Sequence, residues 1–448
     1  MAEHSVSQTV ASVRGSQRER RWQGLFRQRM AGTSLSEWRC VSIDVGKYEH
    51  VALIYDGHGE LLSGPLRFGI RQADYQAFFA WVDRQAGSAT GKPIFGMEPT
   101  GHYYEQLAHE IVQRYGASQL YLIQCTDVAR RREDWNQGSY KDDPVDGCVI
   151  NDLLRDGLGR TYRSARGPYL ALYHLERYRL ALEQASTRLK NQIIGQVDRL
   201  YPGLVIEHDD LARRYQALFR ELWDAKTPRH LLELCPEPAN LSAQTAESLF
   251  ALFRQAGYWM SRPYAAKIVT AVQGLCQPEA VKAHWRSQFL GRDLARLAQL
   301  ETQSAVVEAE MASYVDQTWG RFLTTSGVDP VRLAALVAVI GDMQQYESWR
   351  QLFGRSGLYS RRSDSGVRQH GGQGGRIVRT GDRHLRRQLL RFTRCMEARY
   401  PALRRYHAQL CQRGKYSISA HIAVSRRLCG MLYSVATREV PFDPNRYA

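Results

Sequence analysis

The chain has 448 residues, 44% of them hydrophobic and 10% aromatic, and its 61 lysines and arginines against 45 aspartates and glutamates leave a net charge of +16. This apolar content suffices for more than one buried core and excludes a wholly disordered chain. The longest apolar run, Leu333 to Ile340, is far shorter than the ~20 residues of a membrane-spanning helix. Because the N-terminus also lacks the apolar segment of a secretory signal, we expect a cytoplasmic protein. The positive charge favours a polyanionic partner such as nucleic acid.

Residues 1–38 differ in composition from the rest of the chain. They carry six arginines against three glutamates, with little apolar periodicity, which predicts a flexible basic tail. From Arg39 onward, short apolar runs at 40–45, 50–55 and 61–68 predict an antiparallel three-stranded meander. Helices expected at 72–85 and 104–115 then alternate with strands at 93–97 and 120–123, and a helix follows at 144–155. This order predicts a mixed α/β sheet with helices on its faces.

The segment from Tyr169 to Ser326 reads as almost entirely helical, with two stripes of residues spaced three and four apart. Ordinary core-facing helices explain each stripe. A pair of long helices also fits an antiparallel coiled-coil arm that joins subunits. The stripes are Leu175, Tyr178, Leu182, Ala185, Leu189, Ile193, Val197 and Leu200, and Leu297, Leu300, Ser304, Val307, Met311 and Tyr314.

The last segment, from Phe322 to Ala448, is the most basic. Nine arginines face two aspartates between Arg355 and Arg387, and glycines lie between them. A solvated charged segment is the ordinary explanation, but arginine with interleaved glycine favours close phosphate contacts. The candidate nucleic-acid-binding residues are Arg361, Arg362, Arg368, Arg376, Arg379 and Arg383.

Two acidic residues stand at the ends of predicted strands. Asp44 has apolar neighbours in the first strand, and Glu98 follows the apolar run 94–97. Aspartate is depleted in strands, so Asp44 is explained by a metal, by a base role or by a strand-end turn. Ligand sites collect at strand ends along one rim of an α/β sheet, which makes both residues candidates.

A third acidic group precedes and enters the helix expected at 144–155. Capping and the helix dipole account for Asp142 or Asp143 before Pro144 without any function. They do not account for Asp146, which projects from the same side of the helix as Asp143. If Asp44, Glu98, Asp143 and Asp146 meet, their hard oxygen atoms select Mg²⁺ or Mn²⁺, and a pair of such ions supports phosphodiester cleavage.

Other motifs carry less information. Ser365 lies beside Gly366 in the arginine-rich stretch, where a serine could attack a bound phosphate, although the residues name no base for it. The eight cysteines and the histidines show no spacing typical of a zinc site.

Together these motifs resemble the DEDD transposases of the insertion-sequence one-ten type, whose relatives include the Piv DNA invertases. The resemblance runs in order from Arg39 to about Pro441, and the block around Glu98 is its most specific part. The motifs are Ile43-Asp44-Val45-Gly46, Gly96-Met97-Glu98-Pro99-Thr100-Gly101-His102-Tyr103-Tyr104, Lys141-Asp142-Asp143-Pro144-Val145-Asp146, Gly341-Asp342 and Asp364-Ser365-Gly366.

The resemblance implies an α/β ribonuclease H-like (RuvC-like) domain at 39–165, a helical coiled-coil linker at 166–320 and a mainly α C-terminal domain at 321–448. It implies that an acidic tetrad binds Mg²⁺ or Mn²⁺ and that a serine attacks DNA within a composite site. The implied partners are donor and target DNA, a structured guide RNA and further copies in a tetramer built from dimers, at the prokaryotic nucleoid. The tetrad would be Asp44, Glu98, Asp143 and Asp146, and the serine Ser365.

Two positions depart from the family pattern, with Gly147 where alanine is usual and Val367 where lysine is usual. Neither change removes a catalytic side chain, so an active transposase or recombinase remains the leading interpretation. One alternative is a junction-resolving nuclease that uses the acidic site without the serine step. Another is a non-catalytic nucleic-acid-binding protein that keeps the fold.

Overall fold

The computed structural model describes residues 32–86, 93–136, 143–163, 165–214, 217–223, 225–359 and 381–447. Nearly all of the predicted basic tail therefore lies outside the described residues. The chain divides into two compact units, Met1–Ser164 and Ala165–Ala448. No helix among the described residues is both long and apolar enough to cross a membrane.

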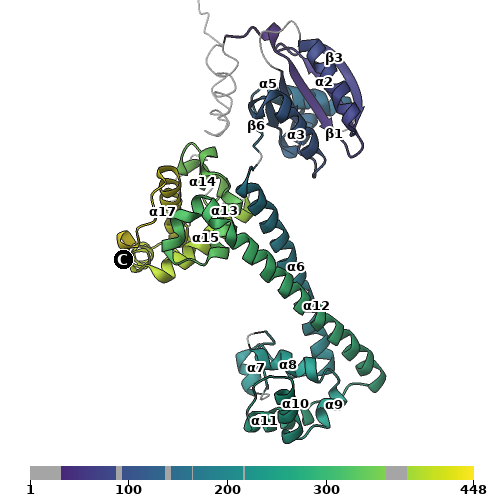
Figure 1. Ribbon diagram of the computed structural model, residues 1–448, viewed down its shortest axis with the longest axis vertical. Helices are drawn as coiled ribbons and strands as arrows, with labels where there is room; N and C mark the ends of the chain where they lie inside the picture. Colours follow the sequence, from purple (N-terminus) through teal and green to yellow (C-terminus); the bar gives the residue numbers. More distant parts are fainter. Residues whose placement is uncertain are drawn as a thin grey trace, which may run out of the picture. The chain divides into compact units, whose positions relative to one another are not determined.

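The first unit is built on a six-stranded mixed sheet with the strand order β3-β2-β1-β4-β5-β6 (Figure 1). The first three strands pair antiparallel, β1, β4 and β5 pair in parallel, and β6 returns antiparallel to β5. The predicted mixed sheet is thus confirmed. The strands are β1 (Cys40–Val45), β2 (Glu49–Tyr55), β3 (Leu61–Gly69), β4 (Ile94–Met97), β5 (Leu120–Leu122) and β6 (Arg160–Thr161).

Four helices cover the two faces of this sheet. Alternation along β1 directs Val41, Ile43 and Val45 into a core with α2 and α3, whereas Cys40 lies in a second core with α4 and α5. The helices are α2 (Gln72–Ala86), α3 (Tyr104–Tyr115), α4 (Cys125–Asn136) and α5 (Asp143–Arg155), with short 3₁₀ turns η1 (Leu35–Glu37) and η2 (Ala117–Gln119).

Helix α4 and strand β6 have no counterpart in the sequence prediction. In α4, Val128 is the only fully buried residue among those whose burial is described, so no apolar stripe marks the helix. Charge holds it in place instead, because Arg131 pairs with Asp152 and Asp156 of α5. Strand β6 has only two residues, too few for a recognisable alternation.

The second unit is helical in the residues that the structure describes, apart from one isolated bridge between Val205 and Phe219. This agrees with the helical character predicted for the segment after Tyr169. The helices are α6 (Pro168–Leu200), α7 (Asp209–Arg214), α8 (Lys226–Leu234), α9 (Pro238–Ser242), α10 (Ala246–Gln255), α11 (Arg262–Gln273), α12 (Ala280–Ser313), α13 (Pro330–Ile340), α14 (Trp349–Ser356), α15 (Arg383–Arg399), α16 (Pro401–Gln412) and α17 (Ser417–Arg438), with 3₁₀ turns η3 (Val315–Gln317), η4 (Trp319–Ser326), η5 (Met343–Gln345) and η6 (Pro444–Tyr447).

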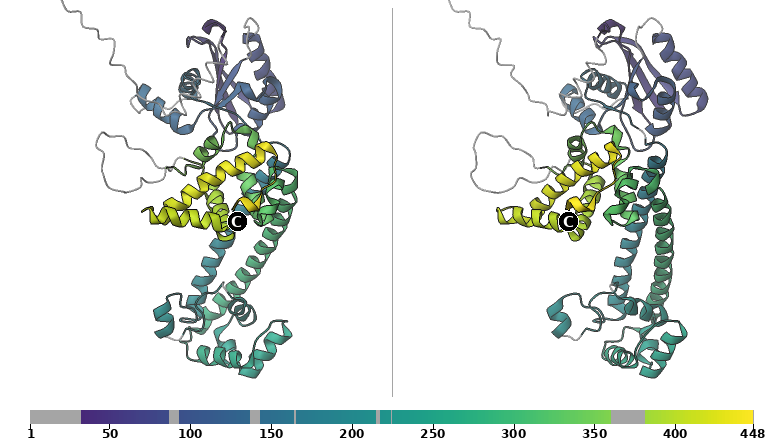
Figure 2. Two further views of the ribbon diagram at one scale, coloured as in Figure 1. Left: turned by 90° about the vertical axis from the view of Figure 1, so that its left-hand side faces the viewer. Right: turned by 60° about the vertical axis from the view of Figure 1, so that its left-hand side comes forward.

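Helices α6 and α12 lie side by side and antiparallel, as both views in Figure 2 show. The direction follows from their polar contacts, since Gln196 binds Asp293 whereas Arg179, earlier in α6, lies 3.7 Å from Glu308, later in α12. Each helix contributes to two separate cores. One core contains α8 to α11 and the other contains α13, α15 and α17.

The predicted stripe on α6 is only partly correct. Leu182, Leu189 and Ile193 are buried as expected, but the side chain of Tyr178 is 53% exposed. At this level of the helix a buried ionic network occupies the inner face in place of apolar side chains. Glu176, which is 2% exposed, accepts hydrogen bonds from Arg179 (2.7 Å) and from Gln388 of α15 (2.8 Å).

Replacing Glu176 tests whether this network stabilises the packing of α6 against α15. Replacing Glu176 with alanine leaves the buried Arg179 without its bidentate partner, and we expect a loss of about 3 kcal/mol in the free energy of unfolding. Glu308→Ala removes a more exposed carboxylate beside the same guanidinium and should cost less than ~1 kcal/mol. Denaturant titration followed by circular dichroism measures both changes, and equal losses would contradict the assignment.

Candidate active site

Two of the predicted acidic residues meet at the carboxyl ends of neighbouring parallel strands. Strand β1 pairs with β4 so that Ile43 lies opposite Met97, which places Asp44 and Glu98 at the next position of each strand. Both side chains are half-buried. The alternation of side chains puts Asp44 on the same face as Cys40, toward α4 and α5. Glu98, one residue beyond Met97, continues the same alternation from Gly96.

Helix α5 crosses this face with its N-terminus at the same rim. A Cβ atom on Gly147 would lie 2.4 Å from Leu53 and 3.8 Å from the hydroxyl of Ser42, so the start of α5 packs closely on β1 and β2. At the other end of α5, Arg155 donates to the carbonyl of His58 (2.9 Å), beyond the last residue of β2. The last residue of β2, Tyr55, pairs with the first residue of β1, Cys40, so the C-terminus of α5 lies near the start of β1. Helix α5 therefore runs antiparallel to β1. Its acidic first turn therefore lies toward the carboxyl end of β1.

Asp146 is the most enclosed of these acidic residues, at 5% exposure. Its Oδ1 accepts a hydrogen bond of 2.5 Å from Nη1 of Arg132 in α4. Asp143 begins α5, but its side chain lies outside the described residues. Among the described side chains, the carboxylate oxygens of Asp44, Glu98 and Asp146 do not form a set in which all lie within 4.8 Å of one another. The sheet thus brings the acidic residues to one rim and one face, and a guanidinium lies against one of them.

Sequence reasoning missed two residues of this site, both on α4. Arg132 is the first, and Cys125, at the N-terminus of the helix, is the second. Partial burial and then a hydrogen bond to Glu98 raise the pKa of the Cys125 thiol from its ordinary 9.0 to about 11. The run of charge Arg130-Arg131-Arg132-Glu133-Asp134 was the available signal, because a charged run beside an acidic site can supply its counter-ions.

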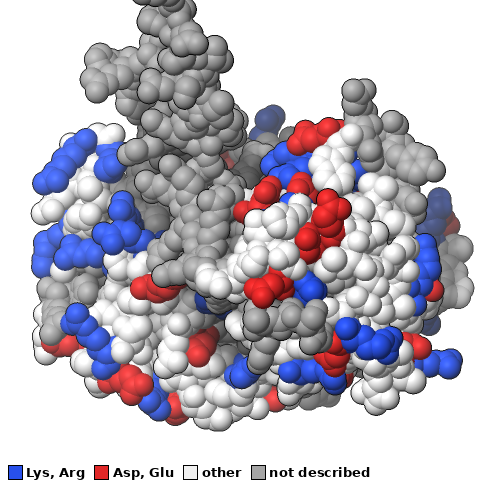
Figure 3. All heavy atoms as spheres, turned by 90° about the horizontal axis from the view of Figure 1, so that it is seen from above, with Lys and Arg blue, Asp and Glu red and all other residues white. Residues whose placement is uncertain are grey.

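The remaining predicted residues belong to the second unit. Ser365 and Arg361, Arg362, Arg368, Arg376 and Arg379 lie outside the described residues. Arg383 is the exposed first residue of α15, directly after Asp382, whose carboxylate caps the helix through the amides of His384 and Leu385. On the face drawn in Figure 3, acidic and basic side chains are interspersed.

Charge divides unevenly between the two units. Residues 1–164 carry 20 lysines and arginines and 20 aspartates and glutamates, so the whole excess of +16 belongs to residues 165–448. The unit with the acidic rim is neutral in sum, and the helical unit carries the surplus that favours binding to phosphate.

Comparison with known proteins identifies the class. One family model, a transposase model of the DEDD IS110 type, matches residues 41–202, and a second, described as the transposase IS116/IS110/IS902 family, matches residues 320–408. Together they cover more than half of the chain, and the first spans Asp44, Glu98, Asp143 and Asp146. The protein is of the transposase and recombinase class. It belongs to the IS110 family, which confirms the resemblance seen in its motifs.

Individual curated proteins are similar to this chain over shorter segments than the family models are. A probable family 20 transposase of Pseudomonas aeruginosa is 28% identical over 154 residues, which is 33% of this chain and 44% of that protein. Pilin gene-inverting proteins of Moraxella lacunata and Moraxella bovis are 31% and 30% identical over 121 residues, or 27% of this chain and 37% of each relative. The matched segment therefore spans less than half the length of these curated relatives.

The raised pKa of Cys125 gives a direct test of its contact with Glu98. At pH 8 a thiol with a pKa of about 11 holds roughly a hundredfold less thiolate than one at 9.0, so we expect slow alkylation by iodoacetamide. Glu98→Gln removes the carboxylate that disfavours the thiolate and should speed labelling several-fold, because burial remains. Peptide mass spectrometry can follow Cys125 beside Cys276, which is also exposed and serves as the control. Equal labelling of Cys125 in both proteins would contradict the contact.

Proposed function

We propose that the chain is a DNA transposase or recombinase that cuts and rejoins DNA with an acidic metal site in the first unit and a serine in the second. Asp44, Glu98, Asp143 and Asp146 would bind Mg²⁺ or Mn²⁺, and Ser365 would act as the nucleophile. The observation that carries the proposal is the gathering of acidic residues at one rim of the sheet, in a chain of the IS110 family.

The proposed fold of the first unit is ribonuclease H-like, of the RuvC type. Three antiparallel strands followed by two parallel strands, with helices on both faces, support this assignment. We propose a catalytic domain at 39–165, a linker at 166–320 and a C-terminal domain with the serine at 321–448. The antiparallel pair α6 and α12 is the part of the linker that would join subunits, in a tetramer that forms the composite site.

The donor atoms at the rim fit a hard divalent cation. They are carboxylate oxygens with no imidazole among them, which is the chemistry that selects Mg²⁺ or Mn²⁺. The ion pair between Arg132 and Asp146 supports the proposal, because it places a positive charge beside one of these carboxylates. When bound, the metal would stabilise the negative charge that develops on the phosphate and on the leaving oxygen.

The chain's own residues would carry the strand exchange. Attack of the Ser365 hydroxyl oxygen on a phosphodiester forms a phosphoserine bond and breaks one phosphate ester, and the serine proton balances the strand hydroxyl that leaves. Attack by the hydroxyl of another strand then restores the serine and joins the DNA. The number of phosphate esters is conserved, so the exchange needs no oxidant, reductant or external energy source.

The surplus charge of the second unit supports nucleic acid as its partner. We propose that arginines of this unit contact the phosphates of donor and target DNA and of a structured guide RNA. Helix α15 continues the basic sequence that precedes it. It carries Arg383, Arg386, Arg387, Arg391 and Arg394 along its length. Phosphate contacts of this kind position nucleic acid without specifying its sequence.

The four residues of the proposed metal site all belong to the first unit. This favours a second candidate function, a junction-resolving nuclease that needs no serine. The two functions separate in one experiment. Purified protein is incubated with Mg²⁺, donor and target duplexes and total RNA from cells that carry the flanking DNA. Wild type is compared with Ser365→Ala and Asp146→Ala.

For the proposed recombinase, only wild type should give joined donor–target product, and each variant should lose at least ~100-fold in rate, because each removes a group that acts on the reacting phosphate. Cleavage that persists in Ser365→Ala and disappears in Asp146→Ala would instead establish the nuclease. Binding without any cleavage in wild type would support the non-catalytic alternative.

The ion pair at Asp146 predicts competition between Arg132 and the metal. Replacing Arg132 with glutamine removes the guanidinium that a cation has to displace, so we expect Mn²⁺ to bind about tenfold more tightly, equivalent to ~1.4 kcal/mol. Calorimetric or electron-paramagnetic titration of the full chain measures this affinity.

The control is the neighbouring variant Arg131→Gln, which breaks pairs with Asp152 and Asp156 further along α5 and should leave the Mn²⁺ affinity unchanged. Weaker binding in Arg132→Gln would mean that the arginine organises the site and does not compete for it.

A further inference from the structure

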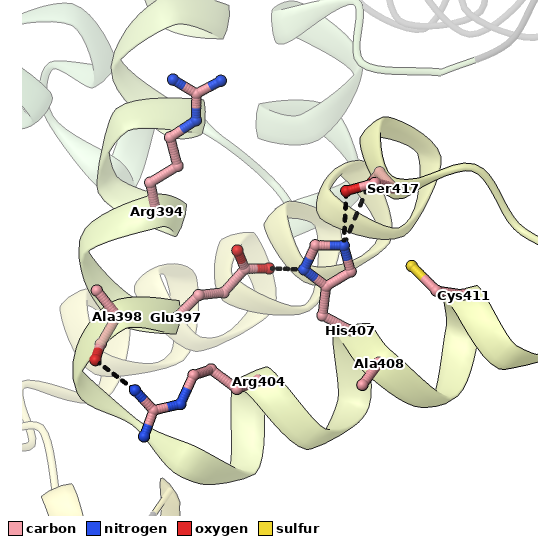
Figure 4. Close-up of a pocket in the computed structure, with 8 residues that line it drawn as sticks. All are labelled: Arg394, Glu397, Ala398, Arg404, His407, Ala408, Cys411 and Ser417. Carbon is pink, nitrogen blue, oxygen red and sulfur yellow. Dashed lines mark hydrogen bonds and ion pairs between the residues drawn. The ribbon is translucent and has the colours of Figure 1, made fainter.

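A second cluster of ionisable side chains lies in the helical unit. Glu397 of α15, His407 of α16 and His421 of α17 each offer a ligand atom, and these three atoms all lie within 4.8 Å of one another. Among the described residues this is the only group of three or more His, Cys, Asp or Glu side chains that is so close. Two of the three, Glu397 and His407, line a pocket of about 500 Å³, which Figure 4 shows.

The carboxylate of Glu397 lies between the two imidazoles. Its Oε2 is 2.8 Å from Nδ1 of His421, and its Oε1 is 3.4 Å from Nδ1 of His407. The Oε1 atom is buried and has no hydrogen-bond partner in the part of the chain that the structure describes. The side chains of Glu397 and His421 are 12% and 7% exposed, so water does little to solvate this carboxylate.

The outer contacts of the two rings determine which nitrogen carries the proton. Nε2 of His407 lies 3.2 Å from the carbonyl oxygen and 3.3 Å from the hydroxyl oxygen of Ser417, and Nε2 of His421 lies 3.3 Å from the carbonyl oxygen of Leu390. A carbonyl only accepts and the Ser417 hydroxyl can accept as well, so a proton on each Nε2 satisfies these outer contacts. In the neutral rings each Nδ1 is then unprotonated and carries a lone pair. Both Nδ1 atoms face the Glu397 carboxylate, which is also an acceptor. Three acceptors that converge in this way require a cation or two additional protons between them.

Neither arginine of the pocket supplies that cation. Arg404 donates to the carbonyl of Ala398 (2.8 Å), and in Figure 4 the guanidinium of Arg394 points away from the imidazole of His407. Two imidazole nitrogens with one carboxylate are a donor set that zinc takes at sites with three protein ligands and an open fourth position. Hydrogen bonds from the outer ring nitrogens to carbonyls are the usual support for such ligands.

We propose that Glu397, His407 and His421 form a zinc site that joins α15, α16 and α17, with the fourth position open to the pocket. The ligands are Nδ1 of both histidines and a carboxylate oxygen of Glu397. The site belongs to the second unit and differs in chemistry from the acidic rim of the first, since it combines nitrogen with oxygen donors. It would tie together the three last long helices of the chain.

The test uses the full-length chain, stripped with a chelator and held in millimolar Mg²⁺ so that Mg²⁺ competes for the acidic rim. Zinc is added, unbound metal is removed by gel filtration, and bound zinc is measured by mass spectrometry together with the thermal midpoint. We expect one more zinc per chain in wild type than in His407→Asn or Glu397→Gln, at least about tenfold weaker binding in both variants, and a zinc-dependent rise of the midpoint in wild type alone.

The matched control is His284→Asn. His284 also lies near a glutamate, with Nδ1 3.8 Å from Glu237, but it belongs to no group of three ligands among the described residues, so zinc binding should be unchanged. Cobalt provides a second measurement that does not depend on the folding of a variant. Wild type should give the visible bands of a tetrahedral nitrogen and oxygen site without a thiolate charge-transfer band.

Retention of zinc by both ligand variants at the wild-type level would overturn the site. So would a wild-type chain that binds neither zinc nor cobalt, because the two imidazoles would then hold protons. A strong thiolate band would also contradict it and would move the ligand set toward a cysteine such as Cys411, which lines the pocket.

Discussion

The close, antiparallel packing of α5 on β1 is the constraint on which the candidate active site depends. The helix approaches the sheet at Gly147 and again at Gly96, where an added Cβ would lie 3.0 Å from Leu154. Both glycines lack a side chain where the helix crosses the strands, so α5 lies near enough for its first turn to share a rim with Asp44. A methyl group at the position of Gly147 would require the side chain of Leu53 to move.

Helix α4 adds what this packing alone does not supply. It brings Arg132 to Asp146 and Cys125 to Glu98, so each of the two acidic residues has a partner from the same helix. Burying a carboxylate without a partner is costly, and a nearby guanidinium offsets that cost in the absence of a divalent ion. The charged residues of α4 therefore stabilise the acidic site. Because α4 has few apolar residues, apolar periodicity does not predict this helix from the sequence.

Much of the first unit was predictable because local patterns determine it. The runs at 40–45 and 104–115 became β1 and α3 with the predicted bounds, and the motifs around Asp44 and Glu98 identified strand ends. The zinc-type cluster was not predictable, because Glu397, His407 and His421 are 10 and 14 residues apart on three helices and only tertiary packing unites them. The role of Ser365 stays a prediction that rests on resemblance.

The separation of charge bears on how such a protein could work. In the proposed function the carboxylate cluster would repel the phosphates on which it acts, and the first unit, with equal numbers of acidic and basic residues, has no surplus positive charge to overcome that repulsion. The second unit carries the whole excess of +16, and residues 321–448 hold nearly all of it, with 23 lysines and arginines against 8 aspartates and glutamates. Binding energy from the basic unit would therefore have to hold DNA against the acidic rim. Under the proposed function the two units would therefore depend on each other, although each has its own cores.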